Sequence, residues 1–381
     1  MDRPLYVSAA QQPSACGLEG NAGLWFDKFC DRWRVSGAAW SLAADDSGNN
    51  PKLDWICGLT KDPVGLQAEL REFSVRLMQL VTRRSGQVAV FKTESRFVTG
   101  LGRSHPVENG FAWHPTLGAP YLPGSSIKGM VRSWAREQAE PSPDHDVVAR
   151  ILGCPGRAGG VCFLDAVPVV PVQLEADVMT PHYAGWSEDD PPGDWRSPTP
   201  IPFLATAAGT KFLFGVVPCA PLQHKDLATA FGWLEAALAW VGAGAKTAIG
   251  YGRMVRDEAA TSQLAETVRR QQEQQEVQRR EEARKASLGP LDRELEEIAR
   301  ADASLAPYLA WLKAVENGRW KEQPDTERDV LERVKAEMEK AGKWKPVSAK
   351  KRPGKDKDHQ RSVQVMRLLD ERTGRGSESK E

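Results

Sequence analysis

Two glycine-rich segments contain the residues best suited to bind an anion. The first, Gly118–Gly129, ends in Pro-Gly-Ser-Ser-Ile-Lys-Gly, which places the hydroxyls of Ser125 and Ser126 and the ammonium of Lys128 where a helix is expected to begin. The first N–H groups of a helix have no partner inside it and attract anions. The segment therefore predicts a phosphate site, with Arg132 one turn further along the same helix.

The second segment, Gly242–Arg253, follows a predicted helix instead of opening one. Its spacing is neither GxxxxGK[ST] nor a strand-borne GxGxxG, which excludes a nucleoside-triphosphate loop. Lys246, Thr247 and Arg253 can bind phosphates. Tyr251 can stack on a base, and the glycines allow another chain to approach closely. Taken alone, each of the two segments is more typical of a tight structural turn.

Histidine and carboxylate side chains give no metal or cofactor signature. His105, His114 and His182 lack the HxxxH or HExxH spacing of convergent ligands, so no metal and no cofactor are predicted. With Arg103, they are candidates for phosphate or base contacts, although a buried turn histidine is the ordinary interpretation. Glu108 is the only carboxylate in the loop before the first glycine-rich segment, so acidic catalysis has one candidate there.

The elements that would position these residues alternate between strand and helix. The pattern predicts an amphipathic helix over 63–83, strands at 88–98, 161–168, 211–217 and 253–256, and helices from Ile127 and over 227–241. The order strand, helix, strand, strand, helix, strand indicates an α+β, ferredoxin-like (RRM-like) sandwich. Residues 1–84 are expected to pack on this domain or to form part of it.

Composition divides the chain near Asp257. Residues 258–381 hold 25 acidic and 27 basic side chains, against 26 and 24 in residues 1–257. The second part predicts an exposed helix (258–287), then a small helical bundle (288–370), with a basic arm (343–357) that contacts RNA or serves as a solvated linker. Residues 371–381 are expected to be disordered.

Overall composition is that of a soluble protein. The chain has 381 residues, a formal net charge of zero and 41% hydrophobic residues, and no apolar run approaches the ~18 residues of a membrane helix. The N-terminus has no signal-peptide pattern, and the six cysteines form no CxxC. We therefore expect a cytoplasmic protein that binds no membrane and has no disulfide framework.

Together the two glycine-rich segments resemble the RAMP superfamily of CRISPR proteins. Three further strings, Gly100–Glu108, Phe163–Pro168 and Asp177–Tyr183, are similar to those of the sixth subunit of the type III-B (Cmr) effector complex. The resemblance covers residues 85–257. It implies a non-catalytic subunit that binds guide RNA toward its 3′ end, meets target RNA, packs against the repeated backbone subunits of the complex and serves antiviral defence.

By the same resemblance, residues 175–206 look like a thumb-like insertion that wedges between guide and target. Its alternative is a surface loop anchored by tryptophans. A rival function is a metal-independent endoribonuclease that processes guide RNA. In that case His105 or His114 would be the general base, and Lys246 or Tyr251 would hold the scissile phosphate.

Overall fold

The computed structural model describes residues 4–13, 15–17, 19–36, 39–43, 49–138, 145–181, 200–219, 224–347 and 356–373. The chain forms two compact units, Met1–Gln271 (unit 1) and Gln272–Glu381 (unit 2). The division falls inside helix α7 (Glu258–Ser287), and not at Asp257, where the composition changes. None of the described helices is long and apolar enough to cross a membrane.

Unit 1 is built on an antiparallel sheet with the order β11-β3-β10-β6, in which β7 also pairs with β10. Its strands are β3 (Gln87–Thr93), β6 (Val161–Phe163), β7 (Val167–Pro168), β10 (Lys211–Pro218) and β11 (Met254–Arg256). The central pair is in register from Lys211 opposite Lys92 to Val216 opposite Gln87. Helices and sheet together make the α+β fold that the sequence predicts.

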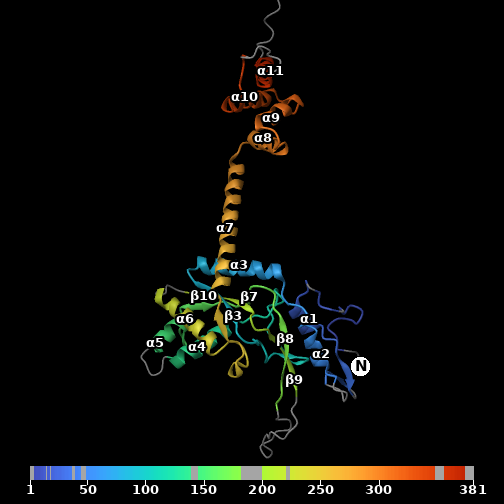
Figure 1. Cartoon of the computed structure of the whole chain (residues 1–381), viewed down its shortest axis with the longest axis vertical. Coiled ribbons are helices and arrows are strands. Elements are labelled where there is room, and N and C mark those ends of the chain that lie inside the picture. Colours follow the sequence, from blue (N-terminus) through green and yellow to red (C-terminus); the bar gives the residue numbers. More distant parts are fainter. Residues whose placement is uncertain are drawn as a thin grey trace, which may run out of the picture. The chain divides into compact units, whose positions relative to one another are not determined.

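Alternating residues of the central strands separate two cores. Ala89, Phe91 and Phe212 face one core, together with helices α4 (Gly124–Gln138), α5 (His145–Leu152) and α6 (His224–Trp240). Val90 and Leu213 face the other core, which α3 (Gln67–Arg83) covers. This is the period of two expected for strands buried on both faces, and Figure 1 shows α3 and α6 on opposite sides of β3 and β10.

A third core joins the N-terminal residues to later parts of unit 1. Phe26 and Trp55 pack with Phe111, Val172 and Leu204, so the N-terminal part is continuous with the unit's interior. The elements here are α1 (Ala22–Lys28), β1 (Arg34–Ser36), β2 (Ala39–Ser41), α2 (Pro51–Cys57) and the hairpins β4 (Ser104–His105) with β5 (Glu108–Asn109) and β8 (Leu174–Met179) with β9 (Ile201–Thr206).

The first turns of α7 belong to unit 1. The N–H of Asp257 donates to the Val90 carbonyl (2.8 Å), and the N–H of Val90 donates to the Thr261 hydroxyl (2.9 Å). Further along, Leu264 and Val268 pack into the core beneath α3. These contacts occupy the edge of β3 beyond the end of β11, which explains why the unit extends past Asp257.

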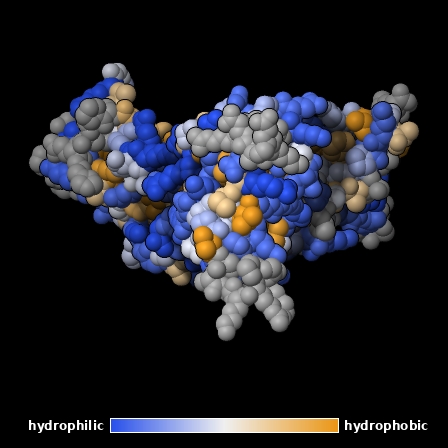
Figure 2. Space-filling model, turned by 90° about the horizontal axis from the view of Figure 1, so that it is seen from above, coloured by the Kyte–Doolittle hydropathy of each residue, from blue (hydrophilic) through white to orange (hydrophobic). Residues whose placement is uncertain are grey.

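Unit 2 is a small helical bundle. Its helices after α7 are α8 (Pro290–Ala301), α9 (Pro307–Glu316), α10 (Pro324–Lys340) and α11 (Lys357–Thr373), and its core includes Tyr308, Leu312, Trp320, Val330, Leu331, Val334, Met338 and Val365. Hydrophobic residues form only small patches on the surface seen in Figure 2. The core side chains named above are buried, so this unit has a hydrophobic core of its own.

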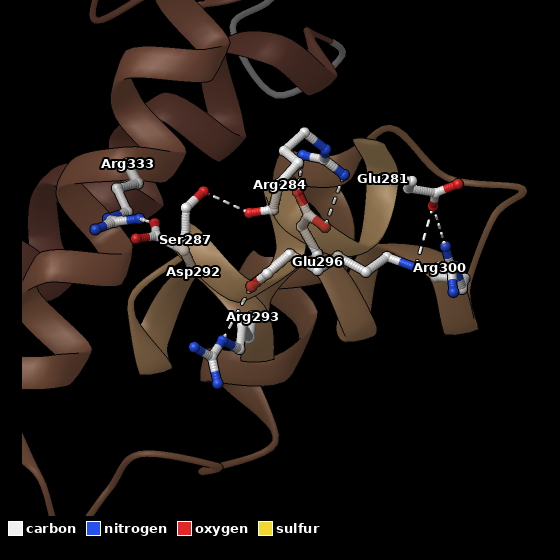
Figure 3. Close-up of polar contacts among 9 residues, drawn as sticks. Glu281, Arg284, Ser287, Asp292, Arg293, Glu296, Arg300 and Arg333 are labelled. Atoms are coloured by element: carbon white, nitrogen blue, oxygen red, sulfur yellow. Dashed lines mark hydrogen bonds and ion pairs between the residues drawn. The ribbon is translucent and has the colours of Figure 1, made fainter. Parts of the chain in front are cut away.

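Charged side chains fix the end of α7 to α8. Arg284 is paired with Glu296 (2.6 Å), as Figure 3 shows. The guanidinium of Arg293 donates to the Lys285, Ala286 and Leu288 carbonyls at 3.1–3.2 Å. Because the last carbonyls of a helix lack partners inside it, Arg293 acts as a cap.

Some predicted segments fall partly outside the described residues. In the basic arm, Lys343 and Lys345 lie 3.7 and 3.5 Å from the Asp358 carboxylate of α11, but residues 348–355 are not described. The same holds for residues 182–199 of the expected insertion and for 374–381. Helix α11 continues to Thr373, so the first residues of the tail expected to be disordered are helical.

Candidate nucleic-acid interface

The second glycine-rich segment forms a closed loop between α6 and β11. The N–H of Ala243 donates to the carbonyl of Gly252 (2.8 Å), which closes the base of the loop, and a short 3₁₀ turn, Thr247–Ile249, forms its tip. Four glycines have φ between +75° and +95°, where residues with a side chain are strained, and these are Gly242, Gly244, Gly250 and Gly252.

Most of these glycines serve contacts within the chain. The N–H groups of Ala245 and Gly252 donate to the carbonyls of Val98 (2.8 Å) and Arg96 (2.7 Å). A Cβ on Gly244 would lie 2.1 Å from the Val98 oxygen, and one on Gly252 would lie 1.9 Å from the Ala243 oxygen. Glycines at this density suit the approach of another chain, but in this structure they let the loop pack on its own neighbours.

The cationic side chains of the loop have no carboxylate partner among the described residues. Arg253 is exposed, and the Lys246 ammonium lies 5.1 Å from the centroid of the Phe203 ring. At the tip Ile249 is 69% exposed, and the space around Gly250 is open. Thr247 is half-buried beside them. The loop therefore presents two positive charges and accessible backbone.

Tyr251 has a polar partner inside the protein. Its hydroxyl donates to the Asp177 carboxylate of β8, and its ring packs beside Phe203 of β9 with 6.4 Å between centroids. Burial and the hydrogen bond to Asp177 raise the pKa of Tyr251, so the hydroxyl stays protonated at neutral pH. Although the residue type suits stacking on a base, this ring is held against the β8–β9 hairpin.

Arg96 completes a polar network with the same hairpin. Its guanidinium donates to the carboxylates of Glu175 (2.5 Å) and Asp177 (2.8 Å). Burial alone would raise the pKa of Asp177, but hydrogen bonds from Tyr251 and the Val178 N–H, together with the Arg96 charge, outweigh it and lower that pKa. Asp177 is therefore ionised at neutral pH.

The first glycine-rich segment opens α4, but an internal carboxylate occupies the helix start. The N–H of Gly124 donates to Asp165 (2.7 Å), and a Cβ on Gly124 would lie 2.1 Å from the Phe163 oxygen. Asp165 already supplies the negative charge that the sequence analysis assigned to a phosphate. Ser125 and Ser126 are exposed on the first turn, and Lys128 is half-buried.

Arg132 is engaged in packing. Its guanidinium donates to the carbonyl of Leu152 (2.6 Å), the last residue of α5. The bond satisfies a carbonyl that the helix leaves without a partner. This side chain, predicted to contact RNA, thus ties α4 to α5.

His105 is an internal residue. Its side chain is 3% exposed, and its ring stacks on Phe26 at a centroid distance of 4.1 Å. Nδ1 accepts from the Val107 N–H (3.2 Å), so Nε2 carries the proton and donates to the Phe26 carbonyl (2.9 Å). Burial lowers the pKa of His105 and keeps the ring neutral. A buried histidine with both nitrogens bonded cannot reach RNA as a base or a ligand.

The remaining candidates are spread over unit 1. His114 is half-buried between Phe73 and Tyr121, and burial lowers its pKa. Arg103 is exposed on the β4–β5 hairpin. Glu108 of that hairpin pairs with Lys52. His182 lies outside the described residues. No group of three His, Cys, Asp or Glu residues capable of holding a metal occurs in the described part of the chain.

The comparison with protein families matches residues 90–255 to the RAMP superfamily. This range contains both glycine-rich segments, all of β6, β7 and β10, and most of β3 and β11. The chain carries a RAMP superfamily domain.

Individual relatives of the RAMP domain belong to CRISPR systems. A curated relative, the CRISPR system Cmr subunit Cmr6 of Pyrococcus furiosus, is 30% identical over 229 residues, which are 43% of this chain and 66% of that protein, just under two thirds of its length. A crystal structure of Cmr6 from the same organism matches at 29% identity, covering 45% of this chain and 97% of that one, with a TM-score of 0.32. A structure of type III-B Cmr-beta bound to cognate target RNA matches at 24% identity, covering 54% and 71%, with a TM-score of 0.45.

Sequence reasoning missed three residues of the RAMP domain that organise the two segments. Arg96 and Asp177 connect the glycine-rich loop to the hairpin, and Asp165 caps α4. Asp177 and Asp165 both lie in the sequence strings that resemble the RAMP family, so these two residues were already indicated by the sequence. Their partners were not, because these bonds join residues 81 and 41 positions apart.

Proposed function

We propose that this chain is a non-catalytic, guide-RNA-binding subunit of a type III-B CRISPR effector complex. The observation that carries the proposal is the match of its RAMP domain to Cmr6, together with the half-buried Lys246 and the exposed Arg253 on the glycine-rich loop, which have no carboxylate partner among the described residues. In this role the subunit binds toward the 3′ end of the guide, meets target RNA and packs against the repeated backbone subunits. Its biological role is RNA-guided antiviral defence in the cytoplasm.

The strand order supports a finer statement about the fold. The elements β3, α4, β6, β10, α6 and β11 follow the order strand, helix, strand, strand, helix, strand. In the sheet the fourth of these strands lies beside the first, and the third separates the first from the second. We infer a ferredoxin-like domain, in which the β8–β9 hairpin is the base of a thumb-like insertion.

The geometry of the candidate bases argues against the rival ribonuclease. His105 is buried with both nitrogens bonded, so it cannot take a proton from a ribose hydroxyl. Glu108, the carboxylate candidate, is paired with Lys52. Tyr251, the candidate phosphate ligand, donates its hydroxyl to Asp177. Two of the four groups named for this rival, His105 and Tyr251, are therefore already engaged, and so is Glu108, the candidate for cleavage of target RNA.

A salt-dependent binding experiment tests the proposed interface. The double variant Lys246→Ala/Arg253→Ala should weaken binding of a labelled repeat-derived guide RNA on the order of tenfold or more. Two lost phosphate contacts should also reduce the slope of log K against log salt by about 1.4, measured between about 50 and about 200 mM. A charge-matched control, Arg76→Ala/Arg83→Ala on α3, should change neither the affinity nor the slope.

Cleavage assays separate the proposal from its rival. Protein incubated with repeat-containing RNA in EDTA should yield no specific product, whereas the ribonuclease would cut at a defined position without metal. Glu108→Gln should leave the number and spacing of target cleavage sites unchanged in the reconstituted complex. Unaltered RNA affinity in the Lys246/Arg253 variant would instead favour a purely structural subunit, which guide crosslinking in the assembled complex would test directly.

A further inference from the structure

A short extended segment, residues 96–98, connects the β8–β9 hairpin to the glycine-rich loop. Phe97 exchanges two hydrogen bonds with Thr206 at the end of β9, through its N–H (3.2 Å) and its carbonyl (2.8 Å). The carbonyls of Arg96 and Val98 point the other way and accept from Gly252 and Ala245 of the loop. Alternate residues of an extended chain bond to opposite sides, so this segment has the hairpin on one edge and the loop on the other.

Side chains from the same three elements close a polar network. Arg96 is bonded to the carboxylates of Glu175 and Asp177, and Asp177 also accepts the hydroxyl of Tyr251. Asp177 thus holds one group from the extended segment and one from the loop. Because it is ionised, both of its bonds are charge-assisted, which is the stronger class of hydrogen bond.

An apolar layer lies beside the network. Phe203 and Ala205 of β9 pack with Val98, and the partly buried Tyr251 ring and Ala245 from the loop pack against them. The Lys246 ammonium lies over the face of Phe203, a cation–π arrangement. The loop therefore contacts the hairpin through its backbone, its tyrosine and the lysine proposed to bind RNA.

We propose that Arg96, Asp177 and Tyr251 are positioning residues that fix the base of the β8–β9 hairpin against the glycine-rich loop, so that both present one continuous RNA-binding surface. The inference rests on the proposed function. It gives Asp177 a role that simple electrostatics would not, because a carboxylate near an RNA site repels phosphate. Positioning and repulsion therefore predict opposite effects when this charge is removed.

Two conservative substitutions exploit that opposition. Asp177→Asn removes a negative charge, yet it should weaken binding of single-stranded guide RNA by about three- to tenfold, because the hairpin and loop separate. Tyr251→Phe keeps the ring and deletes only the hydroxyl, and should give a loss of similar size. The double variant should lose less than the sum of the two single losses, because both changes weaken the same contact between Tyr251 and Asp177. Hydroxyl-radical footprinting should show a shorter protected stretch of RNA.

The salt slope separates this inference from the proposed function itself. Neither substitution removes a phosphate contact, so the slope should stay at the wild-type value, whereas it falls in the Lys246/Arg253 variant. Glu266→Gln, which breaks an exposed ion pair with Arg269 and Arg270 on α7, is the matched control and should bind normally.

Tighter binding by Asp177→Asn, or strictly additive losses in the double variant, would overturn the positioning role. If the Lys246/Arg253 variant also binds normally, the proposed function fails instead. Tyr251→Phe decides the question should Asp177→Asn fail to fold.

Discussion

Two regions of unit 1 look equivalent as sequences but use their polar side chains differently. In the loop Gly242–Arg253, backbone contacts within the chain hold the shape, and Lys246 and Arg253 stay free of carboxylates in the described structure. In the segment 103–132, the chain itself uses the polar groups, as His105 bonds to Phe26 and Arg132 to Leu152.

The difference teaches that the charge of a motif predicts ligand binding less well than whether groups of the same protein already bond to it. A helix start beside two serines and a lysine suits an anion. Here, however, the Asp165 carboxylate already accepts the Gly124 N–H at that helix start. The loop has no helix start and no strong anion geometry, but its cations are available. Binding capacity follows from unpaired groups, which composition alone does not reveal.

The largest effects should come from filling the tight backbone contacts of each region. Gly252→Ala and Gly124→Ala would put a Cβ 1.9 and 2.1 Å from carbonyl oxygens, so each should lower the free energy of unfolding by about 3 kcal/mol or more. Gly250→Ala is the control, because its surroundings are open and only the φ of +95° opposes a side chain. Denaturant unfolding checks this. Equal losses at positions 250 and 252 would show that close approach is not what the loop requires.

A medium effect is expected at His105. Its folded pKa lies below the unfolded value of about 6.5, so the unfolded chain binds the proton first and stability falls as the pH drops from about 7 toward 5. His105→Gln should cost about 1–2 kcal/mol through the lost stacking on Phe26 and should flatten that part of the pH profile. The measurement is the difference between wild-type and variant unfolding curves across this range. A variant as pH-sensitive as the wild type would contradict a buried neutral ring.

Asp165 should have a smaller effect on stability and none on RNA. Asp165→Asn keeps a hydrogen-bond acceptor for the Gly124 N–H but loses the charge, at a cost of about 0.3–1 kcal/mol. Guide-RNA affinity should change less than twofold, as measured by anisotropy. Clearly tighter RNA binding would mean that the start of α4 does face phosphate and that Asp165 had been competing for it.

Gly129 gives the smallest expected change. A Cβ there meets nothing within 4 Å, and the residue is inside α4, so Gly129→Ala should stabilise the protein by up to about 1 kcal/mol. RNA affinity should stay the same. Weaker binding would show that this face of α4 contacts RNA. Segment 103–132 and the loop Gly242–Arg253 would then no longer differ in their ability to bind RNA.

The elements of the sheet and its helices could be predicted because their signal is local. The apolar spacing of Leu70, Phe73 and Leu77 predicts α3. Alternation predicts β3, and the short apolar run after Lys211 predicts β10. The same logic was available for the start of α7, where Ala260, Leu264 and Val268 recur every four residues and pack on unit 1. Composition predicts a boundary near Asp257, because most residues of this helix are charged or polar and only these three form an apolar stripe.

The candidate site was less predictable, because its decisive contacts are remote in sequence. Nothing near His105 indicates that Phe26 covers it, 79 positions away. Local patterns also say nothing of which carboxylate Tyr251 meets, 74 positions away. Residue type therefore predicts which groups are capable of binding RNA. Only the fold shows which of these groups are already bonded inside the protein.

Helix α7 has a further consequence for motion. Its start is anchored through Thr261 and Val90, and its end is capped by Arg293, while residues 272–284 between them are exposed. Pairs along the helix, such as Glu276 with Arg280, support residues 272–280, whereas Glu281 and Arg284 pair with Arg300 and Glu296 of α8. Helices usually open from their ends, but here amide hydrogens should exchange fastest in the middle. The least protected amides of α7 would then lie in its middle, between two well-protected ends.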